Sequence, residues 1–207
     1  MKTYGPWKRG PLAWLLSTLP GKAACHWLFQ GITYMDPTER RFKLALDSVG
    51  VACLFPFARR LFRRPTALLV SVAATHTLNG ILNGQFVSLL KWHGLVRMTD
   101  GELESYLVGL GDRLGGTRGV QGAWAYGSLA RGSRTQWSDI DVRVLRRRGL
   151  RNGITVCMAV ACERTRALLT LAPLDIFVWD SYARASDMRT DEHPIDLLTG
   201  HRAGPAP

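Results

Sequence analysis

A short alternation of charged and apolar residues places the tightest limit on how this chain can fold: residues 139–144 read Asp-Ile-Asp-Val-Arg-Val. Successive side chains of a β-strand point to opposite faces of the sheet, so the three apolar residues would face a core. Asp139 and Asp141 then lie together on the other face. The pattern predicts a strand over Asp139–Leu145 that presents two carboxylates on one side.

The segments around this strand predict a small α/β (α+β) domain with a mixed sheet over residues 99–200. Thr99 or Asp100 is a suitable N-cap for a helix with acids in its first turn, and glycines after residue 114 end that helix. Three further elements are expected: a buried strand over Val120–Tyr126, a helix over Ile154–Thr170 and a strand over Leu174–Trp179.

The positive charge of the chain is concentrated in its first half. The 207 residues carry a net charge of +11. Residues 1–98 hold 13 Lys and Arg against three acids, a net of +10, whereas residues 99–207 hold 14 against 13, a net of +1. We therefore expect a basic, apolar and mainly helical region over 1–98, followed by the α/β domain. The tail over 201–207 is predicted to be disordered.

Because the basic region is also apolar, it favours contact with an anionic membrane surface or another polyanion over a solvated tail. Proline and glycine breaks limit Pro11–Met35 to two short helices. Leu44–Phe57 is typical of a short interfacial helix, since the four arginines between residues 59 and 64 can reach phosphate headgroups.

The segment Thr66–Trp92 is long enough to cross a bilayer, which takes about 20 apolar residues. His76, Asn79 and Asn83 would line one face of such a helix, and a polar stripe inside a membrane is costly unless it faces a partner. Three alternatives stay open: a transmembrane helix, an interfacial or membrane-dipping helix, and a buried helix of a soluble helical subdomain.

The four cysteines, Cys25, Cys53, Cys157 and Cys162, form no CxxC pair, and no convincing signal-peptide cleavage site precedes them. This pattern predicts reduced core cysteines in a cytoplasmic protein. With the basic first half, it also allows a peripheral position on the inner face of the cell membrane.

Two segments carry a specific motif. Residues 125–133 read Ala-Tyr-Gly-Ser-Leu-Ala-Arg-Gly-Ser, and residues 137–142 read Trp-Ser-Asp-Ile-Asp-Val. Together they resemble the signature of the DNA polymerase beta-like nucleotidyltransferase superfamily, in which a strand, a Gly-Ser turn and a short helix precede two acids separated by one apolar residue. The details look closest to the minimal and antibiotic nucleotidyltransferases. The resemblance covers part of the C-terminal half and none of residues 1–98.

The resemblance implies a third carboxylate on a later apolar strand, and Asp175 in Leu174-Asp175-Ile176-Phe177-Val178 stands in that place. The physical chemistry agrees. Nucleotidyl transfer places charge on the attacking and leaving oxygens, which two magnesium ions stabilise. Asp139 and Asp141 can chelate jointly, and Asp175 can complete the site and help to remove the proton of the acceptor hydroxyl.

The Gly-Ser turn is the expected contact for the triphosphate. Gly127 allows close approach of the backbone, and Ser128 begins a helix whose free N–H groups point at phosphate. Ser128 and Arg131 are the side chains expected at the β- and γ-phosphates, and Arg134 is a weaker candidate. The sequence holds no GxxxxGK[ST] phosphate loop.

The expected function is therefore transfer of a nucleoside monophosphate from a nucleoside triphosphate to a hydroxyl of a small molecule, a glycan precursor or a protein. ATP is the first candidate for the nucleoside triphosphate. Two other classes are possible. One is an antitoxin-like or regulatory module that binds a protein partner and whose catalysis is secondary or lost. The other is a basic membrane-bound scaffold that binds no nucleotide.

A purely structural interpretation of the acids also stays open. Asp139 would then cap the strand, and Asp141 would pair with Arg143 or Arg146. Asp180 is the substitute third ligand if the strand register differs, but its odd spacing from Asp175 predicts that it lies on the opposite face.

Overall fold

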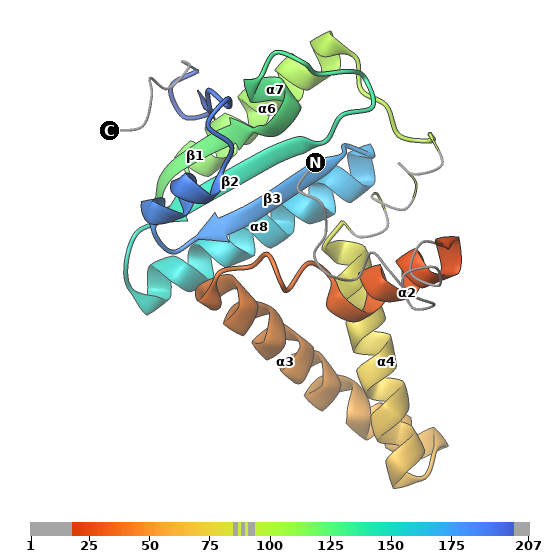
Figure 1. The fold of residues 1–207 in the computed structure, drawn as a ribbon. Coiled ribbons are helices and arrows are strands. Elements are labelled where there is room, and N and C mark those ends of the chain that lie inside the picture. Colours follow the sequence, from red (N-terminus) through yellow and green to blue (C-terminus); the bar gives the residue numbers. More distant parts are fainter. Residues whose placement is uncertain (1–17, 85–86, 88–89, 91–93, 201–207) are drawn as a thin grey trace.

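A four-stranded mixed sheet forms the centre of the C-terminal half (Figure 1). The structure is a computed structural model that describes residues 18–84, 87, 90 and 94–200. The strands lie in the order β3-β2-β1-β4, with β2 parallel to β3 and β1 antiparallel to both β2 and β4. Their bounds are Val120–Tyr126 for β1, Ile140–Arg146 for β2, Leu174–Trp179 for β3 and Ile195–Asp196 for β4. The predicted mixed α/β fold is confirmed, and the short β4 is an addition to the three expected strands.

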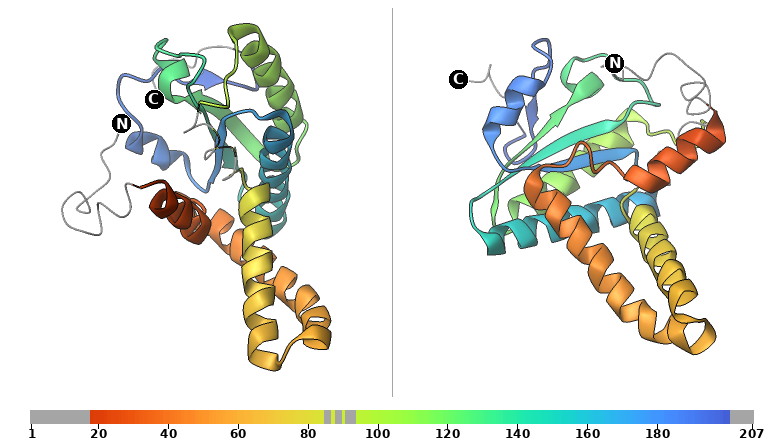
Figure 2. Two further views of the ribbon diagram at one scale, coloured as in Figure 1. Left: turned by 90° about the vertical axis from the view of Figure 1, so that its right-hand side faces the viewer. Right: turned by 60° about the horizontal axis from the view of Figure 1, so that its bottom comes forward.

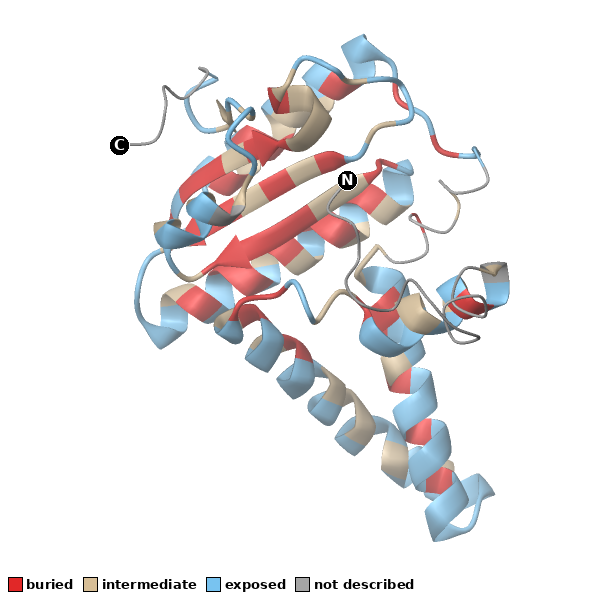
Figure 3. Cartoon of the chain, in the orientation of Figure 1, coloured by how far each residue is buried: buried red, intermediate tan, exposed pale blue. Residues whose placement is uncertain are grey.

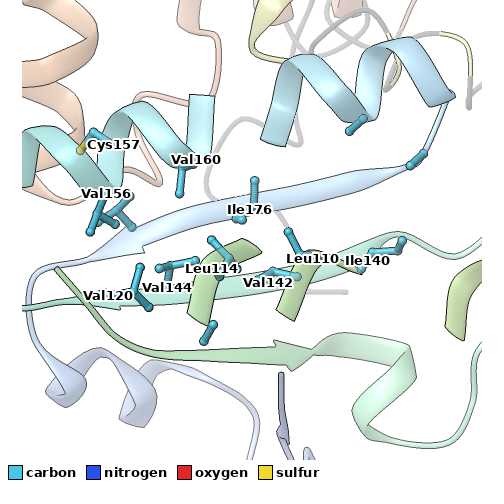
Figure 4. Packing of buried hydrophobic residues seen from close by; sticks show 14 of the residues in the cluster. Leu110, Leu114, Val120, Ile140, Val142, Val144, Val156, Cys157, Val160 and Ile176 are labelled. Atoms are coloured by element: carbon cyan, nitrogen blue, oxygen red, sulfur yellow. The ribbon is translucent and has the colours of Figure 1, made fainter. Parts of the chain in front are cut away.

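Two helices, α6 (Asp100–Gly115) and α8 (Leu150–Thr170), cover one face of this sheet. Thr99 and Glu102 form a reciprocal capping box at the start of α6, which confirms the predicted cap. The core between helices and sheet is made of the buried side chains shown in Figure 4, among them Leu110, Leu114 and Val142. A one-turn helix, α7 (Gly127–Ala130), follows β1, and a 3-10 helix, η2 (Tyr182–Asp187), follows β3.

The described part of the chain before α6 includes the helices α2 (Leu19–Phe29), α3 (Pro37–Leu61) and α4 (Arg64–Leu82). α3 and α4 form an antiparallel hairpin that projects from the rest of the molecule in all three views (Figures 1 and 2). α3 is longer than the predicted Leu44–Phe57 helix, and α4 ends ten residues before Trp92. Of the described helices, α4 alone is long and apolar enough to cross a membrane, by length and composition. The expectations for residues 11–17 and for the tail 201–207 lie outside the described residues.

Buried hydrogen bonds join the helical region to the outer edge of β3. Glu39 on α3 accepts a hydrogen bond from the Val178 N–H at 2.8 Å and forms an ion pair with Arg164 of α8 at 2.6 Å. Asp36, just before α3, accepts from the Asp180 N–H at 2.8 Å. The two regions distinguished by charge therefore share one buried polar interface.

The cysteine prediction is confirmed only in part. All four cysteines are free thiols, but Cys157 alone is buried, whereas Cys53 and Cys162 are exposed. The expectation that all four are core residues is wrong, because Cys53 lies on the outer surface of the projecting hairpin and Cys162 on the outer surface of α8.

Candidate active site

Two of the three predicted carboxylates lie side by side on the sheet face opposite α6 and α8. Asp141 on β2 and Asp175 on β3 are partners in the parallel register, and Tyr126 at the end of β1 is the partner of Asp141 on its other side. Adjacent strands lie about 4.8 Å apart, so these acids are neighbours. Asp139 precedes β2 by one residue and is exposed. The acids therefore gather where β1 ends and β2 and β3 begin.

The Gly-Ser turn packs directly against this site. Gly127 has a φ of +72°, a conformation that other residues adopt only with strain. A Cβ atom on Gly127 would lie 2.1 Å from Oδ2 of Asp141, so the carboxylate would have to shift. The glycine at position 127 thus lets α7 begin beside the carboxylate.

The charge balance of the site is negative. Burial and, to a lesser degree, the neighbouring Asp175 raise the pKa of Asp141 to about 6, while Arg143 acts in the opposite direction. The Arg143 Nη2 atom lies 4.0 Å from Oδ1 of Asp141 and 3.8 Å from Oδ2 of Asp175. One guanidinium at these distances leaves two carboxylates incompletely compensated, which favours an additional cation.

The donor chemistry fits magnesium. Mg²⁺ is a hard cation that binds through one or two carboxylates and keeps several waters. Asp141 and Asp175 supply two such carboxylates in one place, and their side chains are 30% and 47% exposed, so an ion in water can reach them. Within the described part of the chain, no group of three or more His, Cys, Asp or Glu side chains is placed so that it could hold a metal ion.

The residues expected at the phosphates have other partners in the structure. Arg131 follows α7 and forms an ion pair with Glu192. Arg134 forms an ion pair with Asp100, the first residue of α6. Ser128 lies within the single turn of α7 and is partly exposed. Ser128 follows Gly127, which packs on the Asp141 carboxylate, whereas Nη1 of Arg131 is bonded to Glu192.

Sequence reasoning missed Glu192 as a component of this site. Its side chain is only 7% exposed, it binds Arg131, and its charge contributes to the raised pKa of Asp141. Glu192 lies in an irregular segment between η2 and β4, so no periodicity marks it. Arg143, in contrast, is two residues from Asp141 on the same strand face, and the sequence did suggest it as a partner.

An aromatic cluster closes the same sheet face beyond the acids. The rings of Tyr126 and Trp179 are 5.6 Å apart between centroids, and those of Trp124 and Tyr182 are 5.2 Å apart. Burial raises the pKa of Tyr126 to about 12, so its hydroxyl stays neutral at physiological pH. These rings therefore cover the sheet face next to the acids.

The chain matches no protein-family model, no curated protein and no solved structure. Its function has to be argued from this geometry and from the motif.

Asp180 is used elsewhere and does not join the site. It accepts hydrogen bonds from the Thr38 N–H at 3.1 Å and from Arg146 Nε at 2.6 Å. Burial alone would raise the pKa of Asp180, but these bonds outweigh it and hold the pKa below its usual range. The same contacts take Arg146 away from Asp141, so of the two arginines suggested for Asp141 only Arg143 lies near it.

Proposed function

We propose that the protein is a magnesium-dependent nucleotidyltransferase that transfers a nucleoside monophosphate from a nucleoside triphosphate to a hydroxyl group. ATP is the first candidate for the donor. The observation that carries the proposal is the pairing of Asp141 with Asp175 across adjacent parallel strands, with the Gly127 turn packed on the Asp141 carboxylate. Paired carboxylates beside a glycine turn supply the two things that the chemistry needs, a cation site and a backbone approach for phosphate.

The proposed reaction forms a bond between the acceptor oxygen and the α-phosphorus and breaks the bond from that phosphorus to the bridging α–β oxygen. Pyrophosphate leaves with the electron pair, and the proton of the acceptor hydroxyl goes to a base. Asp175 is the proposed base, because its side chain is the more exposed of the paired acids.

Asp139, Asp141 and Asp175 are the residues that would hold magnesium, two ions in the proposed complex. When bound, magnesium supplies electrostatic stabilisation of the charged oxygens. Gly127 and Ser128 are proposed to contact the triphosphate, with Arg131 joining after release from Glu192.

We propose a cytoplasmic location, peripheral on the inner face of the cell membrane. Free thiols are typical of reducing compartments, and all four cysteines are free. The acceptor is proposed to be a small molecule, a glycan precursor or a protein.

A second candidate function is a regulatory or antitoxin-like module that binds a protein and has lost catalysis. One observation favours it: Arg131, the arginine expected at the phosphates, is already bound by Glu192. In this case the acids would face Arg143 and would bind no nucleotide.

The decisive experiment incubates the purified full chain with each labelled nucleoside triphosphate, magnesium and a cell extract. We expect a labelled acceptor with the native protein and none with Asp141→Asn. Asp112→Asn, an exposed acid on α6, is the matched control and should label normally. Calorimetry should show magnesium-dependent ATP binding that Asp141→Asn weakens. Normal labelling by Asp141→Asn would refute the proposal, and absence of ATP binding together with a stoichiometric protein partner would favour the second candidate.

A further inference from the structure

The outer surface of the α3–α4 hairpin is apolar along most of its length. Beyond its base the large side chains point outward, and Figure 3 shows the hairpin as mainly exposed. Leu61 is 80% exposed, Leu69 70% and Phe57 62%. Contiguous apolar surface of this kind marks a site of contact with another molecule or a membrane.

The inner face of α4 is made of small or polar residues. Its buried positions recur every four residues, at Ala67, Ser71, Thr75 and Asn79. The two helices approach closely at Gly50 of α3, where an added Cβ would lie only 2.4 Å from Cγ2 of Thr75. A helix pair in water buries its large apolar side chains, whereas helices in lipid pack through small residues and turn large ones outward.

Ser48 and Ser71 of the hairpin are bonded back to their own helices, whereas Thr75 Oγ1 is buried without a hydrogen-bond partner among the described residues. Ser71 Oγ donates to the Ala67 carbonyl at 2.8 Å, and Ser48 Oγ donates to the Leu44 carbonyl at 2.8 Å. Such bonds satisfy a hydroxyl without water, which lowers the cost of placing it in an apolar medium.

The polar stripe seen in the sequence faces α3. Asn79 donates to Oδ1 of Asp47 at 2.6 Å, and His76 Nδ1 lies 3.3 Å from Oδ2 of the same carboxylate. These polar groups lie at the base of the hairpin, beside α2, where Trp27 contacts His76. Beyond the base, residues 48–58 and 65–75 carry no charged side chain.

The tip of the hairpin is strongly positive. Arg59, Arg60, Arg63 and Arg64 are all exposed, and the sequence from Ser48 to Leu82 contains no acidic residue. This charge complements anionic lipid headgroups, to which each such arginine adds attraction.

We infer that the α3–α4 hairpin embeds its apolar outer surface in the headgroup and upper acyl region of an anionic membrane, with the tip arginines on lipid phosphates. The uncharged part of each helix is about 16 Å long, whereas the hydrocarbon core of a bilayer is about 30 Å thick. An upright hairpin would bring four arginines near the bilayer centre, which is costly. The hairpin is therefore tilted and does not cross. This inference is independent of the proposed transferase activity.

The first test is flotation of the full chain with vesicles of phosphatidylcholine alone or with added phosphatidylserine, at low and high salt. We expect binding to the anionic vesicles only, and less of it at high salt. Changing the four tip arginines to Gln should weaken binding on the order of 1,000-fold. The matched control changes four exposed arginines of the sheet domain to Gln, Arg118, Arg147, Arg148 and Arg151, and should weaken it far less.

The second test uses the protein's own cysteines. With Cys25 and Cys162 changed to Ser, Cys53 is the exposed thiol on the hairpin surface and takes an environment-sensitive dye. We expect a blue shift of emission when anionic vesicles are added. The control keeps Cys162, on the outer surface of α8, in place of Cys53, and should show no shift.

Three results would overturn the inference. The chain could remain unbound to anionic vesicles at low salt, or the tip variant could bind as tightly as the control variant. A blue-shifted dye on Cys53 without vesicles, together with a dimer that Leu69→Asp separates, would show that a second copy of the chain covers the hairpin instead.

Discussion

Glu39 offers the sharpest test of how the helical region is attached. Its carboxylate is 3% exposed and satisfies both the Arg164 guanidinium and the Val178 N–H. Glu39→Ala leaves a buried charge without its partner, which costs about 3–5 kcal/mol. The unpaired N–H adds about 1 kcal/mol or more. Domains of this size are stable by about 5–15 kcal/mol, so the variant should lose a large part of its stability.

The assay is urea unfolding followed by far-UV circular dichroism. Glu39→Gln keeps an acceptor but loses the charge, so we expect an intermediate loss of stability. Glu39→Leu combined with Arg164→Met removes both charges and should recover part of the loss, because the energetic penalty comes mainly from the orphaned charge. The matched control is Asp191→Asn, which breaks an exposed ion pair with Arg189 and should leave the midpoint unchanged.

The reasoning fails if Glu39→Ala unfolds at the same urea concentration as Asp191→Asn. Such a result would mean that water reaches Arg164 readily and that the polar contacts at the β3 edge contribute little. An altered m-value in place of an altered midpoint would instead indicate a change in the unfolded or native ensemble.

Three further predictions follow from the site and from α3. Gly127→Ala should abolish nucleotidyl transfer, measured by labelling, because the Cβ of the alanine would displace the Asp141 carboxylate. Normal turnover would show that residue 127 does not lie so close to Asp141. Asp180→Asn should lower stability by about 1–3 kcal/mol in urea unfolding without changing magnesium binding, since Arg146 loses its charged partner. Burial lowers the pKa of Lys43 to about 8, so the native state binds fewer protons than the unfolded chain between pH 8 and about 10.5. The free energy of unfolding, relative to that of Lys43→Met, should therefore rise with pH through that window. Parallel pH profiles of the two proteins would contradict this prediction.

The sheet was predictable because its pattern is local. The alternation at 139–144 and the apolar runs ending in Tyr126 and Trp179 each mark a strand without reference to the rest of the chain. The predicted bounds of β1 and β3 agree with the structure, and β2 is shifted by one residue. The pair that the structure brings together is Asp141 with Asp175. Asp139 precedes β2, so the shared strand face expected for Asp139 and Asp141 stays a prediction.

The contacts of longer range were not predictable. The short β4 has two residues and no pattern, and Glu192 reaches Arg131 across 61 positions of sequence. The attachment of α3 depends on Glu39 and Val178, which are 139 positions apart. The predicted helix Leu44–Phe57 was shorter than α3, which extends from Pro37 to Leu61; within α3, Asp47 is bonded by His76 and Asn79 of α4, and the helix continues through Pro56.

Side chains close the β3 edge of the sheet. The outward N–H of Val178 binds Glu39, the outward N–H of Asp180 binds Asp36, and the Ile176 carbonyl accepts from Arg164. An extended chain from another molecule cannot pair with groups that are already bonded, so this edge resists strand addition and the aggregation that begins with it. A fragment that begins at residue 99 lacks Asp36 and Glu39 and would expose the N–H groups of Val178 and Asp180 again, so it is expected to self-associate through β3 even where its sheet is correctly formed.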